Sequence, residues 1–270
     1  MEAVNRLDAW IERNGWAGYD PYDIRSTMFF LRLQGASAPL PLKILRRLVF
    51  TIEDRYPLLL RRLFRVRKRY NAKAMGLFAR AYLNLYRRTG SERYKQKAIE
   101  CLEWLEANTS KGYSGSCWGY PFHWQSKVFI PEGTPSSVVS SIAGDAFWTA
   151  HEVLGDAKYL ERCNDICRFF IHDLHTSTQP DGSLCFSYTP LDEFQVHNSN
   201  LFVAEFLTRI GKRTGNREYI DLGIRAAEYA LAEQNEDGSL YYWGRAQNAY
   251  APNHIDHYHS GFEIRALHDI

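Results

Sequence analysis

The chain has 270 residues, of which 45% are hydrophobic and 14% aromatic, and its net charge is only +2. This length suits one large domain with a single core, so we expect one domain over residues 1–270. The nearly balanced charge argues against a nucleic-acid-binding protein. The first residues lack the basic and apolar regions of a signal peptide, and no run of about 20 apolar residues follows. We therefore expect a cytoplasmic protein.

Apolar spacing predicts helices along most of the chain, beginning at residues 3–13. Helices at 25–33 and 40–64 follow, the second bent or broken by Pro57. The remaining chain is expected to form three pairs of helices and one last helix. These lie at 72–88 and 91–107, 136–153 and 157–174, 198–213 and 217–233, and 258–270.

The three pairs are copies of one helical hairpin that recurs about every 60 residues. Each pair turns at a glycine, and a tyrosine follows four residues later, as in Gly155 and Tyr159. The first helix of a pair is rich in small residues and the second in charged ones, which suits inner and outer positions. A repeat of this length predicts an all-α (α/α) toroid, either incomplete or closed by pairing of the first and last helices.

In such a ring, the loops before the inner helices form one rim, and these loops hold many aromatic and polar residues. Aromatic faces stack on sugars, and amide, imidazole and carboxylate groups hydrogen-bond to hydroxyls, so the rim predicts a carbohydrate ligand. The expected substrate-binding residues are Tyr19, Tyr22, Trp118, Tyr120, Trp124, Gln125, Asn198, Asn200 and His257.

His197 and His259 are the first candidates for proton transfer, because both begin inner helices at equivalent repeat positions. Asp256 precedes His259 by three residues and is expected to orient it. Tyr188 is a further candidate acid or base. The alternative is that both histidines cap helices or fill the rim, and that Tyr188 packs or stacks.

Asp20 and Asp23 are candidates for the acid/base pair that glycoside hydrolysis requires. The same spacing is also typical of turns and helix N-caps. Cys163 and Cys167 share a helix face, and we interpret them as buried core residues rather than metal ligands. No metal or other cofactor is expected.

A basic run covers residues 61–69, with leucines between and before its arginines. One interpretation is a cationic amphipathic surface for anionic lipid heads, a polyanionic glycan or a sugar-nucleotide phosphate. The other is a solvated helix face whose arginines extend over apolar surface.

The rim motifs at 118–125, 186–188, 197–198 and 255–262 together resemble polysaccharide-biosynthesis proteins of the VpsJ type, in the six-hairpin glycosidase-like superfamily. Tyr188 and Tyr258-His259 are also similar to the helical domain of D-glucuronyl C5-epimerases, although the chain has no room for the β-rich domain of those enzymes. The resemblance implies an enzyme that acts on a sugar polymer or lipid-linked oligosaccharide, by uronate epimerisation or elimination or by glycoside hydrolysis. The alternative is a glycan-binding or scaffold protein without catalysis.

Overall fold

The computed structural model describes residues 2–33, 40–250, 254–255 and 257–270. The chain divides into two compact units, which are treated one at a time below. The N-terminal unit comprises residues 1–71 and 120–133, and the toroid unit comprises residues 72–119 and 134–270. The expectation of one domain over the whole chain stays a prediction. None of the described helices is both long and apolar enough to cross a membrane.

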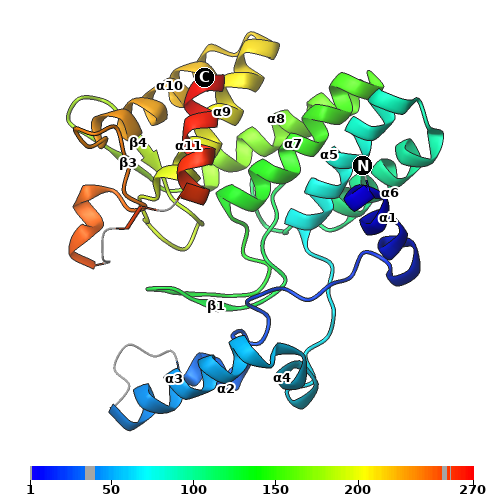
Figure 1. Ribbon diagram of the computed structural model, residues 1–270. Helices are drawn as coiled ribbons and strands as arrows, with labels where there is room; N and C mark the ends of the chain where they lie inside the picture. Colours follow the sequence, from blue (N-terminus) through cyan, green and yellow to red (C-terminus); the bar gives the residue numbers. More distant parts are fainter. Residues whose placement is uncertain (1, 34–39, 251–253, 256) are drawn as a thin grey trace. The chain divides into compact units, whose positions relative to one another are not determined.

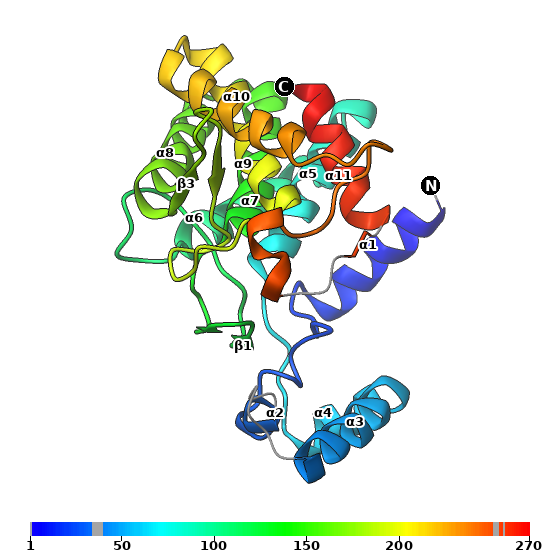
Figure 2. The same cartoon turned by 90° about the vertical axis from the view of Figure 1, so that its left-hand side faces the viewer.

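The described residues of the N-terminal unit form four helices and a short antiparallel hairpin. They are α1 (Glu2–Asn14), α2 (Met28–Leu33), α3 (Leu40–Arg55), α4 (Pro57–Leu63), β1 (Trp124–Gln125) and β2 (Phe129–Ile130). A small core of Ile24, Phe30 and Leu60 holds α2, α3 and α4 together, with Phe50 and Phe64 packed against it. These three helices lie side by side in both views (Figures 1 and 2).

The expected helix over 40–64 is broken at Pro57, as the sequence predicted. Proline lacks the N–H that a continuous helix needs and clashes with the preceding turn, so α3 ends at Arg55. Proline is compatible with the first position of a helix, and Pro57 opens α4 there.

The toroid unit contains the repeated hairpins, all within two residues of the expected bounds. Its elements are α5 (Ala72–Thr89), α6 (Glu92–Ala107), α7 (Ser137–Leu154), α8 (Ala157–Asp173), β3 (Thr176–Thr178), β4 (Leu184–Phe186), α9 (His197–Thr214), α10 (Arg217–Ala232), the 3-10 helix η1 (Arg245–Tyr250) and α11 (His257–Asp269). The inner helices α5, α7, α9 and α11 pack in that order, and α6, α8 and α10 cover them as outer helices (Figure 1). The sequence did not predict the β3–β4 hairpin, which follows α8.

Small residues bring the inner helices close together. A Cβ on Gly76 of α5 would lie 2.9 Å from the Ile142 carbonyl oxygen of α7, and one on Gly144 would meet the Phe206 ring of α9. Glycines also end α7 and α9, because Gly155 and Gly215 adopt left-handed conformations that other residues disfavour. The close packing that the small residues of the inner helices predict is therefore present in the structure.

Candidate functional site

The N-terminal ends of the inner helices are linked by hydrogen bonds that repeat from one hairpin to the next. The first residue of α7, Ser137, donates its N–H to the Tyr188 carbonyl at 2.9 Å. The first residue of α9, His197, donates its N–H to the Tyr242 carbonyl at 3.3 Å. Tyr188 and Tyr242 are thus equivalent residues of successive loops, each fixed by its backbone at the rim.

Tyr242 is at the centre of a group of rings at this rim. His254 stacks on it with ring centroids 5.0 Å apart, and His259 contacts it edge-on at 4.9 Å. His259 is half-buried in the first turn of α11, and His254 is exposed. We call Tyr242, His254 and His259 the histidine–tyrosine cluster. Its imidazole rings can donate or accept hydrogen bonds, and solvent reaches them.

An apolar floor lies beside this cluster. Phe202 of α9 and Phe262 of α11 pack with ring centroids 5.3 Å apart, and Val138 and Ile142 of α7 complete the group. The half-buried Tyr188 side chain packs on the same residues. Phe262 also contacts Tyr258, which contacts His259, so the two predicted proton-transfer residues adjoin one continuous surface.

His197 belongs to the interior rather than to the exposed rim. Its side chain is 1% exposed, Nδ1 donates to the Tyr241 carbonyl at 2.5 Å, and its ring packs against Tyr229. Burial lowers the pKa of His197, which favours the neutral ring. Its Nε2 has no hydrogen-bond partner among the described residues. This geometry fits the structural alternative for His197, not a direct role in proton transfer.

Two further predicted binding residues are buried and hydrogen-bonded within the fold, unlike the open rim positions that the sequence predicted for them. Trp118 is 1% exposed, stacks on Phe147 and donates its indole N–H to the Leu105 carbonyl at 2.9 Å, so a sugar cannot reach its face. Asn200 is fully buried and joins β4 to α10 by hydrogen bonds to the Phe186 N–H and the Ala226 carbonyl.

Asn198 has a different environment. It is 5% exposed, and its side-chain oxygen has no hydrogen-bond partner among the described residues. His257 is exposed at the start of α11. The ring contact with Tyr242 that the structure records involves His259, not His257. Asp256 lies outside the described residues, so its role toward His259 stays a prediction.

Asp20 and Asp23 of the N-terminal unit form a turn, not a free acid/base pair. Asp23 accepts two bonds from Arg61 at 3.0 and 3.1 Å and one from the Asp20 N–H. Asp20 accepts from the Tyr22 N–H and from Asn71. The carboxylates are therefore engaged in the turn and N-cap chemistry that the sequence left as the alternative.

The aromatic residues predicted in the N-terminal unit differ in accessibility. Tyr19 and Tyr22 are exposed, with the Arg61 guanidinium 4.8 Å from the Tyr19 ring centre. Tyr120 and Trp124 are half-buried and contact each other edge-on. Gln125 is half-buried as well and donates to the Ser126 carbonyl at 2.9 Å. A binding role for these five residues stays a prediction.

A layer of charged residues crosses the inner helices below the rim. The ninth residue of each inner helix is charged, namely Arg80 of α5, Asp145 of α7, Glu205 of α9 and Arg265 of α11. Asp145 accepts from Arg80 at 2.9 Å and has Arg265 at 3.9 Å. Together with Arg209, these residues form what we call the charge layer.

Arg209, one turn beyond Glu205, joins the two carboxylates of the charge layer. Its guanidinium lies 2.5 Å from Asp145 and 3.1 Å from Glu205, and packs on the rings of Trp148 and Phe206. Burial raises the pKa of Glu205 to about 7, and the nearby Asp145 charge adds to this while Arg209 opposes it. Glu205 is thus a carboxyl group poised to exchange a proton near neutral pH.

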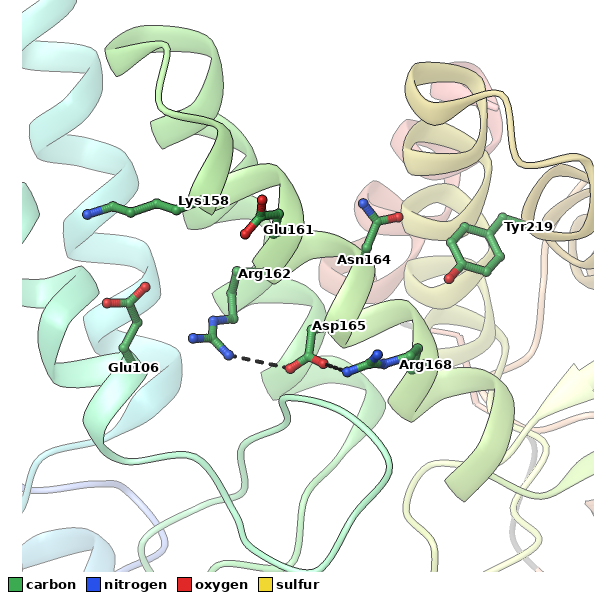
Figure 3. A pocket seen from close by; sticks show the side chains of 8 residues that line it. All are labelled: Glu106, Lys158, Glu161, Arg162, Asn164, Asp165, Arg168 and Tyr219. Atoms are coloured by element: carbon green, nitrogen blue, oxygen red, sulfur yellow. Dashed lines mark hydrogen bonds and ion pairs between the residues drawn. The ribbon is translucent and has the colours of Figure 1, made fainter.

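The outer helices carry a separate surface cavity of about 570 Å³, lined by residues of α6, α8 and α10 (Figure 3). Asp165 lies within it and pairs with Arg162 and Arg168. Asp165 also accepts the Ser116 N–H at 2.9 Å, and these bonds outweigh burial and hold its pKa below the ordinary value. The charged residues of this cavity therefore hold the loop that contains Ser116 against α8. We place the candidate site at the inner-helix rim instead.

Sequence reasoning missed Tyr242 and the charge layer, and it placed His254 in a rim loop without giving it a role of its own. Aligning the inner helices by their starts would have revealed the charge layer, because its members occupy the same position in each copy. Aligning the loops by the helix that follows would have paired Tyr242 with Tyr188. The signal was therefore present in the repeat, but not in any local motif.

No protein-family model matches the sequence, and no curated protein is significantly similar to it. The fold, however, is similar to solved structures. One is a D-mannose isomerase, with 15% identity and a TM-score of 0.55 over 73% of this chain and 52% of that one. Another is a family 76 glycoside hydrolase (mannosidase) of Bacteroides thetaiotaomicron, with 14% identity and a TM-score of 0.54 over 74% and 54%.

A third is a cellobiose 2-epimerase of Bacillus thermoamylovorans, with 12% identity and a TM-score of 0.52 over 74% of this chain and 58% of that one. The chain thus spans about half the length of the structures that it resembles. At this level of identity, the likeness identifies the fold and not the reaction. The repeated hairpins have an α/α toroid fold like that of these structures.

Proposed function

We propose that this protein is a carbohydrate-modifying enzyme that transfers protons at a sugar ring, as in uronate epimerisation or elimination, during polysaccharide biosynthesis. The observation that carries the proposal is the histidine–tyrosine cluster at the inner-helix rim, in a fold shared with sugar isomerases, epimerases and glycosidases. His259 is the first proton-transfer group, since its ring is half-buried yet accessible.

Proton transfer on a sugar carbon needs an acid or base beside an apolar surface that supports the ring. Tyr188 and His259 provide such groups, and the floor of Phe202 and Phe262 lies next to them. In an epimerisation, one group takes the proton from the carbon next to the carboxylate and the other returns a proton to the opposite face. Glycoside hydrolysis is less well supported, because Asp20 and Asp23 are held in a turn.

The experiment compares wild-type protein with His259→Gln and Tyr188→Phe on a panel of uronate-containing and neutral oligosaccharides, followed by NMR in D2O. Deuterium incorporation at a sugar carbon is expected for the wild type. Both variants should lose at least about a hundredfold in rate, as expected for a general acid or base. His268→Gln, an exposed histidine at the other end of α11, is the matched control and should be unaffected.

A non-catalytic glycan-binding or scaffold protein is the second candidate function. It is favoured by the fully structural roles of Trp118, His197 and Asn200, which remove three residues from the predicted rim chemistry. Binding to the same oligosaccharides without any product, and unchanged binding in Tyr188→Phe, would identify this function. A new reducing end in place of deuterium incorporation would identify glycoside hydrolysis.

A further inference from the structure

The helices α3 and α4 present an apolar surface to solvent although both already pack on the core of the N-terminal unit. On α3, Val49 and Phe50 contact that core, and on α4 Leu60 does so. The opposite side of each helix is exposed in the part of the unit that the structure describes. Its large apolar residues are exposed by 37% to 70% and are Ile44, Leu45, Leu48, Ile52, Tyr56, Leu58, Leu59 and Leu63.

The positions of these residues make them one continuous stripe on each helix. Ile44, Leu48 and Ile52 are four residues apart on α3, and Leu59 and Leu63 are four apart on α4, so each set shares a face. Single exposed leucines are ordinary on protein surfaces, but a stripe over two consecutive helices indicates a binding surface. We call this stripe the α3–α4 surface.

The charge around the α3–α4 surface indicates what it binds. Residues 40–69 contain ten Lys or Arg and two acidic residues, a net charge of +8, whereas the rest of the chain has a net charge of −6. The two acidic residues do not lower the charge of the exposed face, because Arg25 pairs with both Glu53 and Asp54. Lys43, Arg47 and Arg62 are exposed next to the apolar stripe.

We propose that the α3–α4 surface binds the face of an anionic lipid bilayer. Leucine and isoleucine side chains enter the boundary between headgroups and acyl chains, while the lysines and arginines contact the anionic headgroups. This combination separates the lipid surface from a soluble polyanion, which would use the charges but would leave the leucines in water. One interpretation of the sequence placed a lipid contact on the basic run 61–69. The proposed contact lies instead on the α3–α4 surface, most of which precedes that run.

Vesicle flotation of the full chain tests the proposal, with vesicles of phosphatidylcholine alone and of phosphatidylcholine mixed with phosphatidylglycerol. We expect at least roughly tenfold stronger binding to the anionic vesicles, since several basic residues each contribute about 1 kcal/mol near such a surface. The double variant Leu58→Glu/Leu59→Glu should lose at least roughly tenfold in binding, because each buried leucine contributes on the order of tenfold. The matched control is Ile224→Glu/Leu231→Glu, two exposed apolar residues on α10.

A second pair of variants separates the charge from the apolar contact. Arg47→Gln/Arg62→Gln should weaken binding to anionic vesicles and leave the weak binding to neutral vesicles unchanged. Arg88→Gln/Arg217→Gln, with exposed arginines of the toroid unit, is its control. Thermal unfolding of each variant reports whether it folds.

Three results would overturn the proposal. They are equal binding to both vesicle types, no binding to either, and full binding by the Leu58→Glu/Leu59→Glu variant. A self-association of the wild type that this variant abolishes, without any vesicle binding, would make the α3–α4 surface an interface between two copies of the chain.

Discussion

The charge layer makes the stability of the protein depend on pH through Glu205. Its pKa is about 7 in the folded protein against an ordinary value of 4.5, so the folded state binds a proton more tightly than the unfolded state. The stability that this proton contributes is fully present below about pH 4.5 and is lost as the pH rises through 7. Linkage gives a loss on the order of 2 to 3 kcal/mol between pH 5 and 8.

The variant Glu205→Gln removes this dependence, because its amide resembles the protonated carboxyl group and does not titrate. The groups that face Glu205 are Arg209 on its own helix, Asp145 on α7, and Arg265 and Asp269 on α11. All four remain in the variant. Relative to wild type, the variant should therefore gain stability on the order of 2 to 3 kcal/mol between pH 5 and 8.

Urea unfolding of both proteins at pH 5, 6, 7 and 8 measures this difference. His197 contributes in the opposite direction, since its lowered pKa costs stability as the pH falls, but this contribution cancels when the two proteins are compared. Glu228→Gln, an exposed glutamate on α10, is the matched control and should run parallel to wild type. Parallel curves for Glu205→Gln as well would refute the assignment of a raised pKa to Glu205.

Three other substitutions test structural roles. Asp145→Asn should destabilise the fold by about 2 kcal/mol in urea unfolding, a discounted value because two of its three arginine partners are over a third exposed; an effect within about 0.5 kcal/mol would contradict it. Trp118→Phe should cost about 2 kcal/mol, because it removes the indole hydrogen bond to the Leu105 carbonyl and leaves part of a buried side-chain volume empty, while glycan binding, measured by calorimetry, stays unchanged. Gly115→Ala should cost roughly 2 kcal/mol, because its Cβ would lie 1.9 Å from the Asp165 carbonyl oxygen; faster proteolysis of the loop that contains it is the measurement, and unchanged proteolysis would contradict the prediction.

The helical hairpins could be predicted because their signals are local and repeated. Glycines at Gly155 and Gly215 end the inner helices, and apolar spacing sets the faces that they bury. Pro57 stops α3 by removing an N–H, which sequence alone reveals. The short β3–β4 hairpin could not be predicted in the same way, since three-residue strands have too few residues for a periodic pattern.

The site was harder to predict, because residue type does not reveal burial. Trp118 and Asn200 look like ligand-binding residues in the sequence, yet one fills the core and the other joins a strand to a helix. His197 and His259 start successive inner helices, but His197 is closed off by its bond to Tyr241 and His259 is not. Equivalent repeat positions therefore predicted equivalent backbone geometry, not equivalent access to solvent.

The inner helices separate two kinds of chemistry along their length. Rings that solvent reaches, such as Tyr242 and His259, occupy the loops and the first turns of the helices. The charge layer occupies the ninth residue of each inner helix. His259 is the third residue of α11, so at 1.5 Å per residue the charge layer lies roughly 9 Å further along the helix axis. Asp145 and Arg209 tie three inner helices together, so changes there should act through stability. Changes at the exposed His254 and the half-buried His259 should act mainly on the ligand, because these rings are more accessible to solvent than the carboxylates of the charge layer. If His259→Gln loses turnover but unfolds like wild type, while Asp145→Asn is destabilised, the chemistry lies at the rim. If both variants are destabilised, the rim rings also stabilise the fold.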